Sequence, residues 1–201
     1  MNIQFTMGVL SLLLILISGA FHCTRVWQGK IVVNPMSWLV WFCVSFAILV
    51  SYKSIGATYN FYAAIGNVIF PGINFLLSLK QKFAKLDEWD IACCGLGIVS
   101  IILWYFTHSN PETVQYANYL AILADLCAII PTYRLVKSNP MVEKPLPWIV
   151  FSIGFGLSIF AITEHTIANY VLPIYMCLGA GVIAFIQVQY RLKIKNTEKW
   201  Y

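Results

Sequence analysis

Charged residues are scarce in this chain. Only 10% of its 201 residues are Asp, Glu, Lys or Arg, whereas 60% are hydrophobic, and a soluble domain usually carries about 25% charged residues. Water could not solvate a surface of that composition. The sequence therefore excludes an ordinary soluble domain and predicts an integral membrane protein.

The motifs of common catalytic and metal sites are also missing. The sequence has no G-x-S-x-G nucleophile elbow, no phosphate-binding loop and no H-E-x-x-H zinc motif. Its six cysteines include no C-x-x-C pair and lie within or beside apolar segments, as buried small residues do. We therefore expect no enzyme activity, no cofactor, no metal site and no disulfide framework.

Seven long apolar runs divide the sequence. They predict an all-α membrane protein with transmembrane helices at 3–22, 37–53, 59–79, 90–107, 114–134, 147–163 and 169–190. Polar breaks that contain proline, such as Asn34-Pro35 and Asn110-Pro111, separate several of them. Because each membrane helix needs about 20 apolar residues, seven helices use about 140 and leave no room for a soluble domain of ordinary size.

Basic residues predict how these helices are oriented. Of the 13 Lys and Arg residues, all except Lys53 follow the first, third, fifth or seventh predicted helix. Lys and Arg accumulate in short cytoplasmic loops, so we expect the N-terminus outside and the C-terminus in the cytoplasm. The net charge of +5 is then a consequence of membrane topology, and we expect no nucleic-acid partner.

A short pattern recurs 110 residues apart, at positions 35 and 145. Pro35-Met36-Ser37-Trp38 opens the second predicted helix, and Pro145-Leu146-Pro147-Trp148 opens the sixth. An even number of helix positions separates the copies, so both halves have the same orientation, which is one of the layouts of small transporters. We predict two parallel three-helix bundles, residues 1–86 and 113–190, joined by a linker helix within 87–112 and followed by a basic tail at 191–201.

With this layout the chain resembles the SWEET and PQ-loop superfamily. Pro131-Thr132 supplies the proline of the Pro-Gln dipeptide that the family carries in the first helix of each bundle, and Phe21-His22 stands at the matching offset in the first half. The chain is also similar to a group of uncharacterised bacterial membrane proteins of about this length. The residues that carry this second similarity are Asn34-Pro35, Trp38, Trp89-Asp90, Ala124-Asp125 and Pro131-Thr132. The resemblance implies the fold and a bacterial inner membrane, but no particular substrate.

Polar side chains mark two of the predicted helices. Asp125 lies in the middle of the fifth, where an ionisable group is costly unless it faces a cavity, a partner or water. Asn118 precedes it by seven residues on about the same face, and Asn67 and Asn74 repeat this spacing in the third helix. These residues either line a shared substrate path, which we predict, or simply hydrogen-bond one helix to another.

Trp41 and three prolines complete the predicted site. Trp41 lies one turn inside Trp38 and is predicted to pack against substrate, although indoles near a membrane boundary often serve only as anchors. Pro71, Pro131 and Pro173 interrupt the third, fifth and seventh predicted helices and are predicted hinges. The alternative is that membrane helices merely tolerate proline.

These features predict a small secondary transporter or facilitator of a polar or zwitterionic metabolite. Alternating access would move the substrate past Asn67, Asn74, Asn118 and Asp125, and a protonatable Asp125 would couple transport to protons. The expected partners are a small-molecule substrate and the lipid bilayer, and a homo-oligomer is compatible with the sequence. The same architecture could instead serve as a ligand-binding membrane receptor or assembly subunit that transports nothing.

Overall fold

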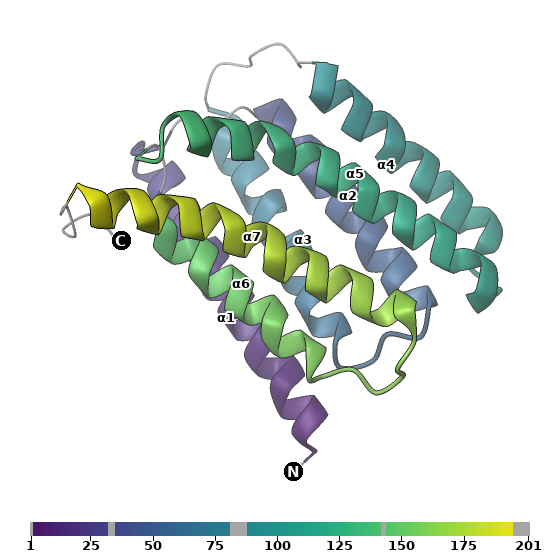
Figure 1. The fold of residues 1–201 in the computed structure, drawn as a ribbon. Helices are drawn as coiled ribbons and strands as arrows, with labels where there is room; N and C mark the ends of the chain where they lie inside the picture. The colour runs from purple at the N-terminus through teal and green to yellow at the C-terminus, as the bar shows by residue number, and fades with distance from the viewer. Residues whose placement is uncertain (1, 32–34, 81–87, 142–143, 195–201) are drawn as a thin grey trace.

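The computed structural model describes residues 2–31, 35–80, 88–141 and 144–194. Within these ranges the chain forms seven α-helices and no strand (Figure 1). The helices are α1 (Ile3–Trp27), α2 (Pro35–Ser54), α3 (Phe61–Ser78), α4 (Glu88–Thr107), α5 (Pro111–Ser138), α6 (Pro145–Ile159) and α7 (Ile167–Lys193). Each predicted helix therefore corresponds to an observed one.

Four helices end three to five residues from the predicted ends: α1, α5 and α7 continue further, and α6 stops earlier. α1 continues past His22 to Trp27. Gly29 then adopts a left-handed backbone conformation, with φ at 67°, which ends the helical path of the chain. α6 ends at Ile159 rather than at residue 163. There the amides of Phe160 and Ala161 donate to carbonyls three residues earlier, which tightens the last turn and closes the helix.

Proline and asparagine determine where several helices begin. α2, α5 and α6 each start with a proline, whose fixed φ suits the first helical turn and whose missing N–H has no helical partner there. Asn110 caps α5, because its side chain accepts a hydrogen bond from the amide of Glu112 at 2.9 Å.

Five helices are long and apolar enough to cross a membrane. They are α1, α2 from Ser37, α3, α5 from Glu112, and α7, whereas the apolar parts of α4 and α6 are shorter, at Ile91–Thr107 and Pro145–Ile159. The outward faces carry large apolar side chains, such as Phe106 and Leu178, which are 78% and 63% exposed. This surface is consistent with an integral membrane protein.

The helices alternate in direction, so the molecule has two distinct ends (Figure 1). α1, α3, α5 and α7 finish at one end, which we call the basic end, and α2, α4 and α6 finish at the opposite end. The described cations of the basic end are Arg25, Lys30, Lys80, Arg134, Lys137, Lys144, Arg191 and Lys193, whereas Lys53 belongs to the opposite end. Lys82, Lys85, Lys195 and Lys199 lie outside the described residues.

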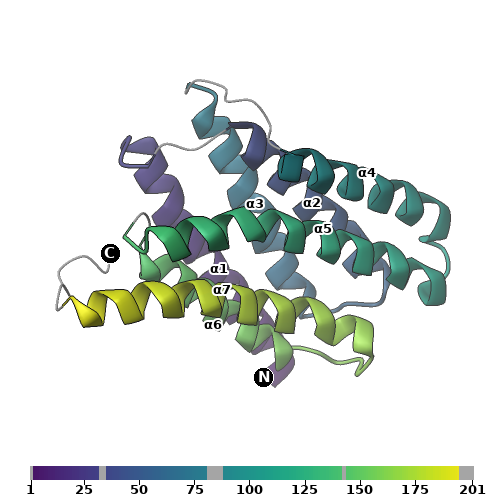
Figure 2. The ribbon, with the colours of Figure 1, turned by 45° about the horizontal axis from the view of Figure 1, so that its top comes forward.

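Helix contacts follow the same order in the two parts of the chain (Figure 2). α3 packs against both α1 and α2, and α7 packs against both α5 and α6. Three further contacts, of α1 with α6, of α2 with α5 and of α3 with α6, connect these groups of helices. α4 packs against α2 and α5.

Glycines allow α1 to lie close to both α3 and α6. A Cβ at Gly66 in α3 would lie 2.8 Å from Ile15 Cγ2, and a Cβ at Gly154 in α6 would lie 2.9 Å from Ile15 Cγ1. Both distances are too short for a side chain to fit. Ile15 is fully buried between these two helices, so the close packing around it holds the centre of the molecule together.

Candidate functional site

Two of the predicted site residues contact α2. Asn67 in α3 donates from Nδ2 to Ser45 Oγ at 3.3 Å, and Asn118 in α5 accepts at Oδ1 from Ser51 Oγ at 3.3 Å. Both asparagines are buried. They therefore bond to a helix that lies next to both α3 and α5, and not to each other.

Asn118 has unused hydrogen-bonding capacity. Its side chain is fully buried, and its Nδ2 atom has no hydrogen-bond partner among the described residues. An amide nitrogen carries two donor hydrogens, and leaving a buried donor unsatisfied costs about 1–3 kcal/mol. The contact between α2 and α5 therefore contains a buried polar atom that has no hydrogen-bond partner among the described residues.

Asp125 faces a different neighbour. Its Oδ2 accepts a hydrogen bond from the hydroxyl group of Tyr175 at 2.8 Å, and its side chain is only 8% exposed. The bond joins α5 to α7. Asp125 and Asn118 thus lie on one helix but bond to different helices, Asn118 to α2 and Asp125 to α7.

Asn74 and Trp41 belong to a cluster near the basic end. The Oδ1 atom of Asn74 lies 3.2 Å from His22 Nδ1, and the His22 ring is 5.0 Å from the Trp38 ring, which is 5.5 Å from Trp41. We call His22, Trp38, Trp41 and Asn74 the aromatic cluster. Asn74 is fully buried and its Nδ2 has no partner in the described part of the chain, so this cluster also contains a free donor.

The five predicted substrate contacts therefore divide among three places. Asn67 and Asn118 bond to α2, Asp125 bonds to α7, and Asn74 and Trp41 belong to the aromatic cluster. The sequence indicated the polar residues, but the hydrogen-bond partner of each could not be deduced from it. The single path that these residues were predicted to line stays a prediction.

The predicted hinges lie inside helices. Pro71 is buried within α3 and Pro173 within α7. Pro131 lies inside α5, but its side chain is outside the described part of the structure. Their role as hinges stays a prediction.

Pro173 frees a backbone carbonyl in α7 that a side chain of α2 then binds. Proline has no N–H, so the carbonyl four residues earlier, that of Asn169, lacks its helical donor. The hydroxyl group of Tyr52 in α2 fills this vacancy and donates to the Asn169 carbonyl oxygen at 2.7 Å. Asn60 donates from Nδ2 both to Tyr52 Oη at 2.6 Å and to Asn169 Oδ1 at 3.3 Å. We call Tyr52, Asn60 and Asn169 the end junction.

Neighbouring contacts extend the end junction across the opposite end of the molecule. Asn169 Nδ2 donates to the backbone carbonyl of Glu164 at 3.1 Å, and the hydroxyl groups of Thr58 and Thr163 lie 2.6 Å apart. The junction thus ties α2 and the start of α3 to α7. Sequence reasoning missed its three residues, although the four-residue spacing of Asn169 and Pro173 marks a carbonyl that needs an outside donor.

Gln187 is a further polar residue that was not predicted as part of the site. It is fully buried in α7, and neither polar atom of its side chain has a partner among the described residues. Arg191, one turn later, is also fully buried and donates from Nη1 to the carbonyl groups of Pro140 and Gln187 at 3.0 and 3.1 Å. The C-terminal part of α7 therefore carries buried polar side chains.

No metal site is apparent in the described ranges. No three His, Cys, Asp or Glu side chains within them are placed to hold one ion, and the six cysteines are not joined in disulfides.

Comparison with protein-family models, with curated proteins and with solved structures finds no match to this chain. The interpretation of the site therefore rests on its own geometry. The resemblance to the SWEET and PQ-loop superfamily stays a prediction from the sequence.

Proposed function

We propose that the chain is a small secondary transporter or facilitator of a polar or zwitterionic metabolite. The substrate would pass between two three-helix bundles, α1–α3 and α5–α7, which α4 links. Alternating access would open the path first at one end of the molecule and then at the other.

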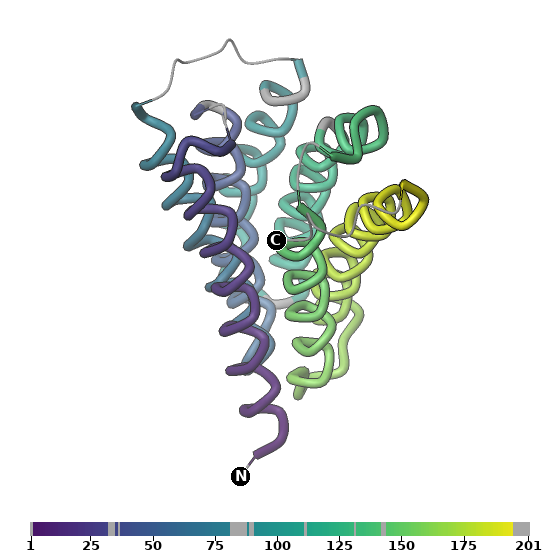
Figure 3. Tube along the Cα trace, turned by 90° about the vertical axis from the view of Figure 1, so that its left-hand side faces the viewer, coloured from purple at the N-terminus to yellow at the C-terminus, as the bar shows by residue number. Residues whose placement is uncertain are grey.

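The helix packing supports two related bundles. In each group of three, the third helix contacts both of the others. Figure 3 places α1, α2 and α3 on one side, drawn in purple to blue, and α5, α6 and α7 on the other, drawn in green to yellow. Such a division is what a rocking motion of two bundles requires.

The observation that carries the proposal is the unsatisfied amide of Asn118. It lies where α5 packs against α2, and therefore at a contact between the two proposed bundles. Its side chain makes a single hydrogen bond, to Ser51, so one of its two polar atoms is unpaired whichever way the amide is turned. A buried group of this kind is retained at a cost of about 1–3 kcal/mol, which a bound polar solute would offset.

Asp125 provides a route to proton coupling. It is the one acidic residue in the middle of an apolar helix, and intramembrane acids commonly serve proton relays. Protonation would give the Asp125 carboxyl group a donor hydrogen and leave a weaker, uncharged acceptor for the Tyr175 hydroxyl group. A proton gradient could thereby bias the contact between α5 and α7.

The charge distribution supports an orientation with the basic end in the cytoplasm. All described Lys and Arg residues except Lys53 belong to that end, as the positive-inside rule expects. The N-terminus would then be outside, and the proposed location is a bacterial inner membrane.

The test is solute binding and uptake by the purified full-length chain. We would measure thermal stabilisation in detergent across a panel of metabolites at two pH values, and then uptake into liposomes. Wild type should be stabilised by one solute class, whereas Asn118→Leu and Asp125→Asn should lose that stabilisation. Ser100→Ala is the matched control, because Ser100 is buried and donates only to a backbone carbonyl, that of Ala117 at 2.8 Å.

Two results would contradict the proposal. If no solute stabilises or enters the liposomes while the variants are merely less stable, Asn118 and Asp125 are structural. If a solute binds but does not cross, the chain is a ligand-binding receptor or assembly subunit. Deleting the residues after Lys193 would then abolish activity if they form the docking segment.

A further inference from the structure

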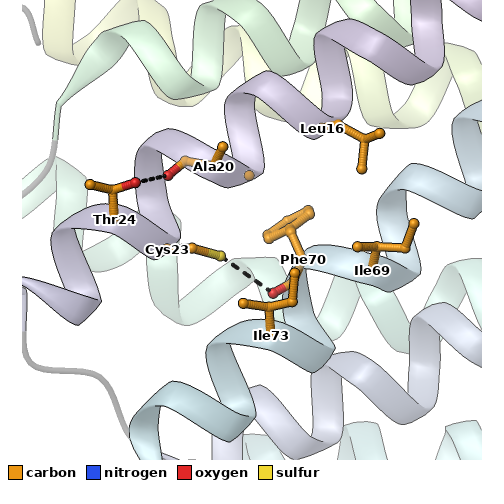
Figure 4. Close-up of a pocket in the computed structure, with 8 residues that line it drawn as sticks. Leu16, Ala20, Cys23, Thr24, Ile69, Phe70 and Ile73 are labelled. Atoms are coloured by element: carbon orange, nitrogen blue, oxygen red, sulfur yellow. Dashed lines mark hydrogen bonds between the residues drawn. The ribbon is translucent and has the colours of Figure 1, made fainter.

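A groove runs along the outer surface between α1 and α3 (Figure 4). It has a volume of about 240 Å³. Leu16 and Ala20 line it from α1, and Ile69 and Ile73 line it from α3. Ala20, Ile69 and Ile73 are exposed, so the groove opens to the side of the molecule, where the bilayer would lie.

Small side chains on α1 create the groove. Gly19 lies directly against Phe70, because a Cβ at Gly19 would be 2.5 Å from Phe70 Cβ. Gly19 and Phe70 both line the groove, and the short side chain of Ala20 leaves the space beside it open.

The groove offers almost nothing to a polar solute. The Thr24 hydroxyl group donates to the carbonyl of Ala20 in its own helix at 2.7 Å, and the Cys23 thiol contacts the carbonyl of Phe70 at 3.9 Å. Both bonds are visible in Figure 4. Since the polar groups are bonded within the protein, the wall presents hydrocarbon and suits an acyl chain.

The length of the groove is comparable to one leaflet of a bilayer. Eight residue steps separate Leu16 from Thr24, the first and last residues of α1 that line the groove, which is about 12 Å of helix, and Trp27 lies three residues beyond. Half of the hydrocarbon core of a bilayer is about 15 Å. Trp27 is 77% exposed and stands where an interfacial indole is expected.

Two lysines follow the ends of the two helices that line the groove. α1 and α3 are parallel, because Ile15 contacts Gly66 and Gly19 contacts Phe70, so both helices finish at the same level. Lys30 lies in the turn that closes α1, where its amide donates to the Arg25 carbonyl at 2.9 Å, and Lys80 follows the end of α3. Both lysines are exposed.

We infer that this groove binds an anionic phospholipid, with one acyl chain between α1 and α3 and the phosphate near Lys30 and Lys80. Charge complementarity selects this occupant, since an apolar groove that ends in two exposed ammonium groups matches an acyl chain with an anionic headgroup. The inference does not depend on the proposed transport function.

The test counts lipids on the full chain by native mass spectrometry in detergent. Dioleoyl phosphatidylglycerol and dioleoyl phosphatidylcholine have the same chains and differ in headgroup charge. We expect one tightly bound phosphatidylglycerol, and weaker binding of phosphatidylcholine. Replacing both lysines, Lys30→Gln with Lys80→Gln, should weaken phosphatidylglycerol binding about 25-fold, at about five-fold for each cation near a membrane surface.

The controls separate this groove from general lipid coating. Lys137→Gln with Lys193→Gln removes two exposed lysines from the same end of the molecule and should leave the tight site unchanged. Ala20→Phe fills the groove and should abolish both the tight binding of phosphatidylglycerol and the weaker binding of phosphatidylcholine in it. Ala92→Phe, at an exposed position of α4, should not. The lysine pair lies outside the helices, so this arm remains informative even if Ala20→Phe fails to fold.

Three outcomes would overturn the inference. Equal binding of the two lipids, with no effect of the lysine replacements, would mean that the headgroup charge is not recognised. Unchanged phosphatidylglycerol binding by folded Ala20→Phe would place the lipid elsewhere. Dimers of wild type that Ala20→Phe converts to monomers would show that the groove holds a second copy of this chain.

Discussion

The end junction predicts that a single oxygen atom stabilises the fold substantially. Tyr52→Phe removes the donor to the Asn169 carbonyl at 2.7 Å and the acceptor of the Asn60 amide at 2.6 Å. Hydrogen bonds between membrane helices average about 0.6 kcal/mol and reach about 1.7. Here Pro173 already deprives that carbonyl of its helical donor, so the variant leaves a buried acceptor unpaired. We expect a loss of about 2 kcal/mol.

The assay is thermal unfolding of the purified chain in one fixed detergent. For a chain of this size, about 2 kcal/mol corresponds to a decrease in Tm of about 4–8 °C. Tyr116→Phe is the control, because Tyr116 is 60% exposed and its replacement should change stability by less than about 0.5 kcal/mol. Tyr52→Phe and Asn60→Ala should also be less than additive, since they break the same bond. Equal Tm values for Tyr52→Phe and Tyr116→Phe, or full additivity, would refute the reasoning.

Five further substitutions test how the helices pack. Asp125→Asn keeps an acceptor for the Tyr175 hydroxyl group, so its Tm should lie within about 2 °C of wild type. Tyr175→Phe leaves Asp125 without its donor, so the free energy of unfolding should fall by about 1–2 kcal/mol in the same assay. Gly8→Ala would drive a methyl group into the backbone of the α2–α3 connection, so the free energy of unfolding should fall by about 1–3 kcal/mol. Gly95→Ala is the control, because the space around Gly95 is open, and its Tm should be close to that of wild type. Gln187→Leu removes a buried side chain that has no partner among the described residues, so its Tm should equal or exceed that of wild type; a lower Tm would reveal a bond to a group outside them.

The helices could be predicted from the sequence because their signals are local. Apolar runs, proline at the first turn and capping residues such as Asn110 act within a few positions of each helix end. The errors also have local causes. α1 continued through Cys23–Trp27, where the helical pattern weakens without a breaker, and α6 closed early in a tight turn at Phe160.

The partners of the site residues could not be predicted, because they depend on how each helix is rotated about its axis. Asn118 and Asp125 are seven residues apart and share about one face, yet one bonds to α2 and the other to α7. A helix of 3.6 residues per turn drifts by about 20° over seven residues and rises by about 10 Å, so the two side chains lie at different levels and meet different neighbours. Hydropathy carries no information about such a rotation inside an apolar bundle.

Rings and hydrogen bonds both join helices across this molecule. In the middle of the helices, Phe70 of α3 meets Phe151 of α6 with ring centroids 5.9 Å apart. The opposite end is closed by hydrogen bonds between α2, α3 and α7, including that of Tyr52 to Asn169. Water can replace hydrogen bonds of this kind when helices separate, so opening costs less than leaving the same groups dry and unpaired.

Tyr52→Phe should therefore favour an open form at this end as well as lower Tm. In the open form, water would reach the Asn169 carbonyl, whereas the closed form of the variant leaves that carbonyl unpaired. If the closed form loses about 2 kcal/mol relative to the open form, the open fraction rises about 30-fold. Ala57, which is 1% exposed beside the junction, is the reporter position. In a background without native cysteines, a membrane-impermeant maleimide should label Ala57→Cys about 30-fold faster when Tyr52 is Phe, provided that opening is faster than labelling. Unchanged labelling together with a lowered Tm would mean that the junction stabilises the whole fold and does not control access at this end.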